Sequence, residues 1–381
     1  MNIRMHGACG EVGRSGILVE DKGKRVMLDY GVKIVQEENT YPLPVQGYLD
    51  AVILSHAHLD HSGSVPLLYE NSEQPLYATA PTMRLVEMLV EDSIKVNALK
   101  GLEAIFDKRH MKRMMRNVSS CRYGREVREK QFSFKFEDAG HILGASSVQL
   151  DMGNRRVVYS GDFKLEATRL HEPAFCNYKD VDVLITEATY GSKIHENRRK
   201  IEKEFVEECW NVCDSDGIVI VPAFAVGRAQ EIVSVLVNNH FEYPVYLDGM
   251  AKKSAEIMME FPGFLKNYKE FYKAMKKAVW IENEKDRKEA LRQPGVIVST
   301  AGMLSGGPAV SYIMKIRDYE NKAVFFSGYQ AHGTPGRKLL DTGRMEYEGF
   351  DLDFTDYNIK KFDFSAHADK LGLLEFAKKC G

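Results

Sequence analysis

A dense cluster of metal-binding side chains directly follows the apolar run Ala51–Leu54, in the segment Ser55-His56-Ala57-His58-Leu59-Asp60-His61. Three histidines and an aspartate supply the nitrogen and oxygen donors that Zn²⁺ prefers. Alternate residues of an extended segment point the same way, so we expect His56 and His58 to hold one ion together, with Asp60 and His61 turned towards a neighbouring position. The segment therefore predicts a metal site at the end of a strand.

Further ligands are expected at other strand ends, because two donors on one loop rarely complete a site. His141 lies in a turn flanked by glycines, which permit tight backbone conformations, and Asp162 follows the predicted strand Arg156–Tyr159. Asp29 ends another predicted strand. An acid beside imidazole ligands commonly orients them, and we expect this role for Asp29 rather than direct metal binding.

The first half of the chain is rich in short β-type runs. Apolar and β-branched residues predict strands at 16–19, 25–28, 51–54, 132–136, 147–150, 156–159 and 183–185. One long stretch interrupts them, from about Pro81 to Arg116, where apolar residues at spacings of three and four predict helices. A first unit of about 1–192 is therefore expected to be β-rich.

After about Lys193 the pattern alternates between helices and apolar strands. Helices are predicted at about 199–213, 229–237 and 309–317, and strands at 218–221, 245–247, 296–299 and 323–326. Continuous apolar strands separated by helices indicate a parallel sheet covered on both faces. We expect a second, α/β unit at about 193–362, with Phe362–His367 forming a strand and loop that return to the first unit.

Composition excludes several classes of protein. The 381 residues are 44% hydrophobic and 28% charged, and 30 glycines and 12 prolines show no period, so the chain is neither disordered nor fibrous. Apolar runs fall far short of the ~20 residues of a membrane helix, and no signal-like segment begins the sequence. Six cysteines without a CxxC pair favour a reducing compartment, and we predict a cytoplasmic protein without membrane contact.

Positive charge is concentrated in one segment, although the formal net charge of the chain is −2. The segment from Lys95 to Lys130 contains eleven basic residues and only four acidic ones. This excess could bind phosphates, and Lys112 and Arg113 are candidate RNA contacts. The alternative is a solvated helical face whose charge is balanced elsewhere.

The metal-binding motifs resemble those of a known enzyme superfamily. A His-x-His-x-Asp-His segment, a glycine-flanked histidine and a Ser-Gly-Asp turn look like the metallo-β-lactamase fold. A closer resemblance, to β-CASP nucleases such as RNase J and the endonuclease of the cleavage and polyadenylation specificity factor, rests on Thr186–Gly191, Pro222–Glu231, Ser299–Pro308 and Phe364–His367. It covers almost the whole chain.

The resemblance implies an α/β architecture in which one domain interrupts another. An αββα sandwich of the metallo-β-lactamase type would comprise residues 1–192 and resume at 363–381. The β-CASP domain, a parallel sheet flanked by helices, would be inserted at 193–362.

The resemblance also assigns metal ligands and cofactors. It makes His56, His58 and His141 ligands of one zinc ion, Asp60 and His61 ligands of a second, and Asp162 the bridge between them. The family has a further histidine that completes the second zinc site. The sequence reaches Gly381 without it, so we expect two zinc ions per chain, with either a truncated sequence or a weakly held ion at an incomplete second site.

The expected reaction is hydrolysis of phosphodiester bonds in single-stranded RNA, in RNA processing or decay. Two zinc ions lower the pKa of a bridging water towards ~7, which supplies a hydroxide nucleophile. Glu187 and His367 match the acidic residue and the histidine of two family motifs. We expect His367 to protonate the leaving 3′-oxygen and Glu187 to orient it, so that Asp60, His367, Glu187 and Asp29 form the catalytic set.

Contacts with RNA are also expected outside the metal site. His332 lies among glycines after an apolar strand, and the Gly-rich turn at Gly306 could present backbone N–H groups to a phosphate. Ser365 precedes His367 closely, and Arg228 belongs to a family motif. These residues, together with Lys112 and Arg113, are the candidate RNA contacts.

Three other functions are compatible with parts of the sequence. A small-molecule hydrolase would use the same metal centre but would not need the insertion at 193–362. A DNA-directed β-CASP nuclease would differ only in substrate. A catalytically weakened RNA-binding subunit would account for the absent third histidine. A homodimer is expected from the resemblance, whereas endonucleolytic or exonucleolytic action stays open.

Overall fold

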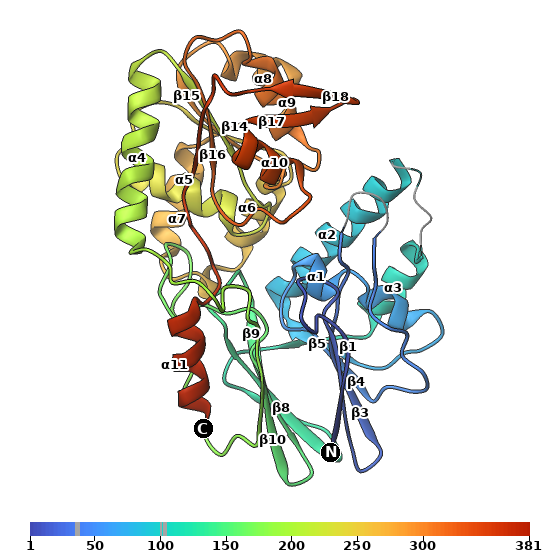
Figure 1. The fold of residues 1–381 in the computed structure, drawn as a ribbon. Helices are drawn as coiled ribbons and strands as arrows, with labels where there is room; N and C mark the ends of the chain where they lie inside the picture. Colours follow the sequence, from blue (N-terminus) through green and yellow to red (C-terminus); the bar gives the residue numbers. More distant parts are fainter. Residues whose placement is uncertain (35–38, 100, 102–104) are drawn as a thin grey trace. The chain divides into compact units, whose positions relative to one another are not determined.

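The computed structural model describes residues 1–34, 39–99, 101 and 105–381, and these divide into two compact units. The first unit contains residues 1–194 and 366–381, and the second contains residues 195–365 (Figure 1). The boundaries expected at 192/193 and 362/363 lie within a few residues of these limits. Lys100 and Glu103, counted in the basic segment, lie outside the described residues.

Two sheets form the centre of the first unit. The six-stranded sheet has the order β1 (Asn2–Gly7), β2 (Gly16–Asp21), β3 (Lys24–Tyr30), β4 (Ala51–Ile53), β5 (Leu76–Thr79) and β6 (Val118–Cys121). The five-stranded sheet has the order β11 (Val183–Ile185), β10 (Arg155–Tyr159), β9 (Ser146–Met152), β8 (Phe132–Asp138) and β7 (Glu126–Arg128). Strands β3 to β6 pair in parallel, and β7 to β10 pair antiparallel.

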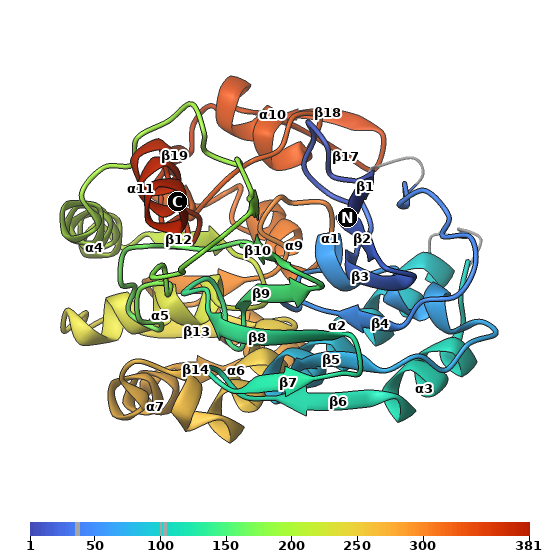
Figure 2. The same cartoon turned by 90° about the horizontal axis from the view of Figure 1, so that it is seen from below.

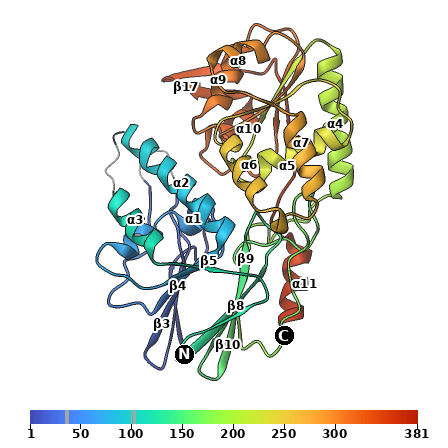
Figure 3. The ribbon, with the colours of Figure 1, turned by 180° about the vertical axis from the view of Figure 1, so that it is seen from behind.

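Apolar side chains from both sheets form one core between them. Phe132, Phe134 and Phe136 alternate along β8 and face the buried residues of β2 and β3, including Val19 and Leu28. This alternation follows from the period of two along a strand. Helices cover the outer faces of the sheets (Figures 1 and 3): α1 (Leu59–Ser62), α2 (Ala80–Leu99) and α3 (Lys108–Arg116) on one side, α11 (Lys370–Cys380) on the other. The predicted αββα sandwich is confirmed.

The second unit is built on one parallel sheet. Its strands have the order β14 (Val279–Trp280), β13 (Val245–Asp248), β15 (Gly295–Ser299), β12 (Ile218–Pro222), β16 (Lys322–Phe326) and β19 (Asn358–Lys361). Figure 2 shows β14, β13 and β12 in this order across the sheet. Every residue of β12, β15 and β16 is buried, because helices cover both faces. The predicted parallel α/β sheet is confirmed.

The remaining elements of the second unit surround this sheet. Its helices are α4 (Arg198–Asp214), α5 (Arg228–Asn238), α6 (Ala251–Glu260), α7 (Tyr268–Lys277), α8 (Glu284–Ala290), α9 (Pro308–Lys315) and α10 (Pro335–Thr342). Strands β17 (Arg344–Tyr347) and β18 (Phe350–Asp353) form a separate antiparallel hairpin. None of the helices among the described residues combines the length and apolar character needed to cross a bilayer.

Some local predictions were wrong. Residues 362–367 contain no strand, and the final strand of the sheet is β19, which ends at Lys361. β19 reads Asn-Ile-Lys-Lys, whose single apolar residue gives no strand pattern, whereas the apolar residues after it form a turn in which Phe364 N–H donates to the Phe362 carbonyl at 3.0 Å. The helices predicted for 81–116, in contrast, are confirmed as α2 and α3, and Asp107 caps the second of them.

Candidate metal centre

The His-rich segment bends sharply at the end of strand β4. His56 follows the strand, His58 is the N-cap of α1, and Asp60 and His61 lie in this short helix. The segment is therefore extended only as far as His58, and the helical turn moves Asp60 and His61 away from the direction of His56. One loop thus supplies donors to two adjacent positions.

Two left-handed glycines place the other donors beside this loop. Gly140 has φ +64°, and a Cβ there would lie 2.7–2.8 Å from backbone atoms of three neighbouring residues, so only glycine fits before His141. Gly161 has φ +54°, and its Cβ would lie 2.9 Å from the Cβ of Ser55. These close approaches bring His141, after β8, and Asp162, after β10, against the loop that follows β4.

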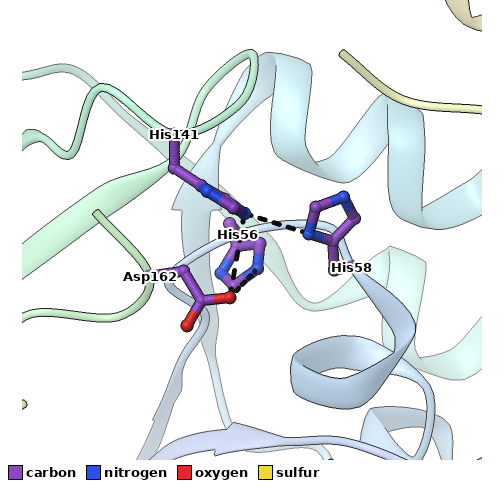
Figure 4. A group of neighbouring side chains, drawn as sticks. All are labelled: His56, His58, His141 and Asp162. Carbon is purple, nitrogen blue, oxygen red and sulfur yellow. Dashed lines mark hydrogen bonds and ion pairs between the residues drawn. The ribbon is translucent and has the colours of Figure 1, made fainter. Parts of the chain in front are cut away.

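The first donor group comprises His56, His58, His141 and Asp162 (Figure 4). The Nδ1 atom of His58 lies 3.1 Å from Nε2 of His141. Oδ2 of Asp162 lies 3.4 Å from Nε2 of His56 and 3.7 Å from Nε2 of His141. All four side chains thus direct one donor atom at a common point.

The second donor group comprises Asp60, His61 and Asp162. Nε2 of His61 lies 3.4 Å from Oδ1 of Asp162 and 3.9 Å from Oδ2 of Asp60. Asp162 therefore faces the first group with one carboxylate oxygen and the second group with the other. Such an arrangement suits a carboxylate that bridges two cations.

Asp29 orients two of these imidazoles from behind. It is the extra residue of a β-bulge in β3, with φ +57°, and this bulge turns its side chain into the core. His61 donates to it from Nδ1 at 2.7 Å. Ser55 Oγ donates to it at 2.6 Å and lies 3.0 Å from Nδ1 of His56, so it can accept that proton. Both imidazoles are thereby fixed with Nε2 facing the donor groups, which is the geometry expected for Asp29.

The segment that begins at Ala366 completes the surroundings of the two groups. The carbonyl of Ala366 accepts from Nδ1 of His141 at 2.8 Å. The free lone pair of this imidazole is therefore on Nε2. Nδ1 of His367 lies 2.9 Å and 3.1 Å from the two carboxylate oxygens of Glu187. With Asp162 these two residues form a third convergent cluster.

Two imidazoles of the first group are held neutral. Burial lowers the pKa of His58 and His141 well below the ordinary histidine value. The neighbouring His56 lowers the pKa of His58 further, and His367 does the same for His141. Neutral imidazole is the form that binds a metal, so His58 and His141 need no deprotonation at pH 7.

The pKa values of two other imidazoles, those of His61 and His367, are raised. Burial alone would lower the pKa of His61, but Asp162 and Asp60 raise it well above the ordinary value. The pKa of His367 is likewise opposed by burial and raised by Glu187 and Asp162 to about 9. Burial acts to raise the pKa of Asp162, yet His61 and His367 hold it well below its usual range. Without a cation, protons balance the buried carboxylate charge.

The first donor group fits a zinc ion. A tetrahedral zinc with donors at about 2.0–2.1 Å separates its donor atoms by about 3.3 Å, close to the 3.1, 3.4 and 3.7 Å observed here. Nε2 of His56 is fully buried and has no hydrogen-bond partner among the described residues. A buried acceptor of this kind is costly unless a cation or donor meets it. The residues present therefore fit a bound metal.

Comparison with known protein families agrees with the two units. Residues 17–173 match the metallo-β-lactamase superfamily domain, and residues 229–339 match the β-CASP domain. The protein named RNase aCSPSF2 from Saccharolobus solfataricus is 37% identical over 99% of this chain and 76% of its own length. The chain belongs to the β-CASP family of the metallo-β-lactamase superfamily.

Other relatives in this family carry different names. A probable RNase, MJ4, from Methanocaldococcus jannaschii is 34% identical over 100% of this chain and 90% of its own length. Transcription termination factor FttA from Thermococcus kodakarensis is 33% identical over 99% of this chain, which spans 64% of that factor. The relatives thus include ribonucleases and a termination factor.

The candidate RNA contacts of this β-CASP protein divide into exposed and buried residues. Exposed positions are His332, Gly306 and Lys112. Ser365 is buried. Arg113 is partly buried, and its guanidinium donates to the carbonyls of Tyr69 and Glu70, which tethers α3 to the short helix Val65–Tyr69.

Arg228 requires a correction. It was predicted as an RNA contact, but its side chain is only 9% exposed and its Nη1 lies 2.8 Å from Oε2 of Glu231. Glu231 also pairs with Arg198, whose Nη2 lies 2.5 Å from Oε1. Arg228 points inward because the following helical turn supplies its counter-ion, so it contributes to the interior of the β-CASP unit.

Sequence reasoning missed three residues that support the centre. The Tyr159 hydroxyl donates to Oδ2 of Asp29 at 2.6 Å, and Ser55 links Asp29 to His56. Lys164 is buried and donates from Nζ to the His367 carbonyl at 3.2 Å. Tyr159 and Ser55 adjoin predicted ligand motifs, which was the only signal. Lys164 had none, because its contact depends on a segment two hundred residues away in sequence.

Proposed function

We propose that this chain is a zinc-dependent ribonuclease that hydrolyses phosphodiester bonds in single-stranded RNA. The observation that carries the proposal is the pair of donor groups that share Asp162. Paired metal sites bridged by one ligand are a recurrent solution for phosphoryl chemistry, because two cations can stabilise the attacking and leaving oxygens together.

The first group would hold one zinc ion through His56, His58, His141 and Asp162, and the second would hold another through Asp60, His61 and Asp162. When bound, zinc supplies Lewis acidity and lowers the pKa of a bound water towards ~7, which provides a nucleophile at neutral pH. Imidazole and carboxylate donors at these separations suit zinc better than calcium or magnesium, which prefer sets of oxygen ligands.

His367 would act on the leaving group. Glu187 engages its Nδ1, so Nε2 is the nitrogen from which a proton can pass to the leaving 3′-oxygen. Glu187 would be a positioning residue, since it acts through His367. Asp29 would likewise act through His61 and through Ser55, and neither acid needs to contact the substrate.

RNA is favoured as substrate by the relatives. Two of them are named as RNases, and their alignments span three quarters or more of their own lengths. A DNA substrate or a catalytically weakened RNA-binding subunit are the competing functions. A cytoplasmic location and a homodimer stay predictions.

Digestion of end-labelled RNA tests the proposal. Single-stranded RNA labelled separately at its 5′ and 3′ ends would be incubated with chelator-treated protein before and after addition of Zn²⁺, beside DNA of the same sequence. We expect zinc-restored cleavage of RNA, reduced by Asp60→Ala and retained by Asp318→Ala, an exposed aspartate of the second unit. The two ladders separate endonucleolytic from exonucleolytic cleavage.

Two results would overturn parts of the proposal. RNA retained by the zinc-loaded protein without any cleavage would indicate a binding subunit. Equal or faster cleavage of DNA would reassign the substrate while leaving the metal chemistry intact.

A further inference from the structure

The helix α3 and the strands that follow it carry an excess of positive charge. Among the described residues 105–130, nine are basic and three are acidic, in a chain whose formal net charge is −2. The excess of six positive charges therefore contrasts with a net negative remainder. No part of the proposed metal chemistry uses these residues.

Helix α3 sorts its residues into a buried and a basic face. Met111 and Met114 are buried, whereas Lys108, Lys112 and Arg116 are exposed. Residues four apart lie on the same side of a helix, with Cβ atoms about 5–6 Å apart, so these three cations form one stripe. The stripe is a property of the folded helix, since sequence order alone scatters the charges.

Few acids neutralise this stripe. Asp107 is engaged by Arg109 at 2.8 Å and by the first backbone N–H groups of α3, and Glu126 pairs with Arg128 at 2.8 Å. Within the part of the chain that the structure describes, Lys108, Lys112 and Arg116 have no ion-pair partner within 4.0 Å, and neither have Arg122 and Arg125. Five solvent-exposed cations thus keep their full charge.

The chain continues from this stripe along an exposed edge. Among the described residues, strand β6 is the last strand of its sheet and pairs with β5 alone, and its residues Ser119 and Ser120 are exposed. Arg122 and Arg125 occupy the turn that follows. Figures 1 and 3 show α3 at the edge of the first unit opposite α11. Hydroxyl groups and an unpaired strand edge add hydrogen-bond donors beside the cations.

We propose that Lys108, Lys112, Arg116, Arg122 and Arg125 form an exosite that binds the phosphate backbone of single-stranded RNA outside the metal centre. This proposal rests on the proposed function in one respect, namely that RNA is the polyanion. The exosite is rich in charge, whereas the central part of a protein–protein interface is depleted of charged residues and enriched in aromatic ones. A polyanion fits it better than a protein partner, and the backbone contacts imply no preference for base sequence.

The exosite would serve long substrates selectively. Each phosphate that a cation neutralises releases counterions, and for single strands the slope of log K against log salt changes by about 0.7 per contact. At 0.1 M salt this corresponds to roughly fivefold in affinity per contact. An RNA of a few nucleotides can occupy the metal centre alone, so its cleavage would not depend on the exosite.

Matched triple variants test the exosite. K108A/K112A/R116A removes two lysines and one arginine from α3, and R199A/K200A/K203A removes the same set from α4, where Lys200 and Lys203 already pair with glutamates. Binding of a long fluorescent single-stranded RNA would be measured in chelator, so that cleavage plays no part, over a range of salt concentrations. Alanine is a strong helix former, so both helices should persist, and thermal unfolding checks this.

The outcomes separate the exosite from the nuclease. We expect the α3 variant to bind tenfold to a hundredfold more weakly at 0.1 M salt, with a salt slope lower by about two, and the α4 variant to bind like wild type. With zinc, the α3 variant should show a raised KM for long RNA and unchanged cleavage of a tetranucleotide. Equal binding by the two variants would overturn the exosite, whatever the nuclease assay shows, and so would an α3 defect that is independent of salt. Absent cleavage with an intact α3 effect would overturn only the proposed function.

Discussion

The two units bury charged side chains in opposite ways. In the second unit, Glu231 lies between the guanidinium groups of Arg198 and Arg228. Asp248 accepts from Arg287 at 2.8 Å and from the Tyr312 hydroxyl at 2.9 Å. Each of these buried charges meets an opposite charge or a donor from the protein itself. The charges of this network are paired inside the unit, although Nε of Arg228 has no hydrogen-bond partner among the described residues.

The first unit instead directs acceptors at acceptors. Nε2 of His56 has no hydrogen-bond partner among the described residues, and Nε2 of His141 and Oδ2 of Asp162 converge on the same point. Their convergence is unfavourable in the empty protein and becomes favourable when a cation binds. Burial of charge therefore does not by itself mark a functional site. The informative feature is a convergent set of imidazole and carboxylate donors in which Nε2 of His56 has no hydrogen-bond partner among the described residues.

The largest effect is expected from replacing Asp162, the carboxylate that both donor groups share. Asp162→Ala removes a donor from both groups, and we expect bound zinc to fall below one ion per chain and the cleavage rate to fall about 10³-fold or more. The physical basis is the several kcal/mol that bound metal contributes to transition-state stabilisation. Metal analysis and initial rates check this, with Asp318→Ala as the control. Full zinc content in a folded Asp162→Ala protein would contradict it.

Replacing the central acid of the second unit should affect stability instead. Glu231→Gln leaves the buried guanidinium of Arg228 without its counter-ion, whereas Arg198 keeps Glu202 at 3.5 Å. The loss is expected to cost about 3–5 kcal/mol of the free energy of unfolding. Zinc content per folded molecule should stay unchanged. Denaturant unfolding measures the loss. The control is Glu207→Gln, an exposed partner of Lys203, for which little change is expected. A stable Glu231→Gln protein that fails to bind zinc would reverse the comparison.

Asp29→Asn should have an intermediate effect on the metal centre alone. The amide can no longer accept protons from His61 and Ser55 as the carboxylate does. Loss of such supporting hydrogen bonds typically costs 10–100-fold in metal affinity or activity. Competition with a zinc chelator measures the affinity, and the unfolding midpoint in chelator shows whether the fold is intact. Unchanged zinc affinity would show that the bulge at Asp29 serves only the fold.

The smallest expected difference between the two donor groups is in the number of protons released when zinc binds. Asp162 and Asp60 raise the pKa of His61 against the effect of burial, so His61 is protonated in the empty protein at pH 7 and must lose that proton when metal binds. Zinc affinity of the second group should therefore rise with pH by up to tenfold per unit, until the raised pKa is passed. His58 and His141 are already neutral, so these two imidazoles should release no proton.

Calorimetric titrations in two buffers of different ionisation enthalpy count these protons. The His61→Ala variant should release about one proton fewer than wild type. Equal proton release by both proteins would place the titrating group elsewhere.

Sequence patterns indicated the candidate donors that the structure brings together, but not the side chains that support them. The residues from His56 to His61 lie in one motif, so their capacity to bind a metal can be inferred from the sequence without knowledge of the fold. Asp162 and His141 were recognisable because glycines mark the turns that place them. Strands such as β12 and β15 could also be predicted from the sequence, since they are mostly apolar along their length.

Other features depend on tertiary contacts that no local pattern encodes. Lys164 reaches the His367 carbonyl across the fold, and the inward direction of Arg228 depends on Glu231 and on its burial under neighbouring elements. Short edge strands such as β6 and β7 carry polar residues, so their pairing follows from position in the sheet rather than from hydrophobicity.

The contact between His141 and the Ala366 carbonyl can form only after the whole second unit has been synthesised. Residues 195–365, which form the whole second unit, are synthesised before Ala366 and His367. At about 5–20 residues per second, this unit takes roughly ten to thirty seconds to synthesise. A nascent chain in that interval already contains every donor of the two groups but lacks His367 and the carbonyl that fixes the His141 tautomer. Until Ala366 and His367 are added, the nascent chain therefore lacks both the carbonyl that accepts from His141 and the histidine proposed to act on the leaving group.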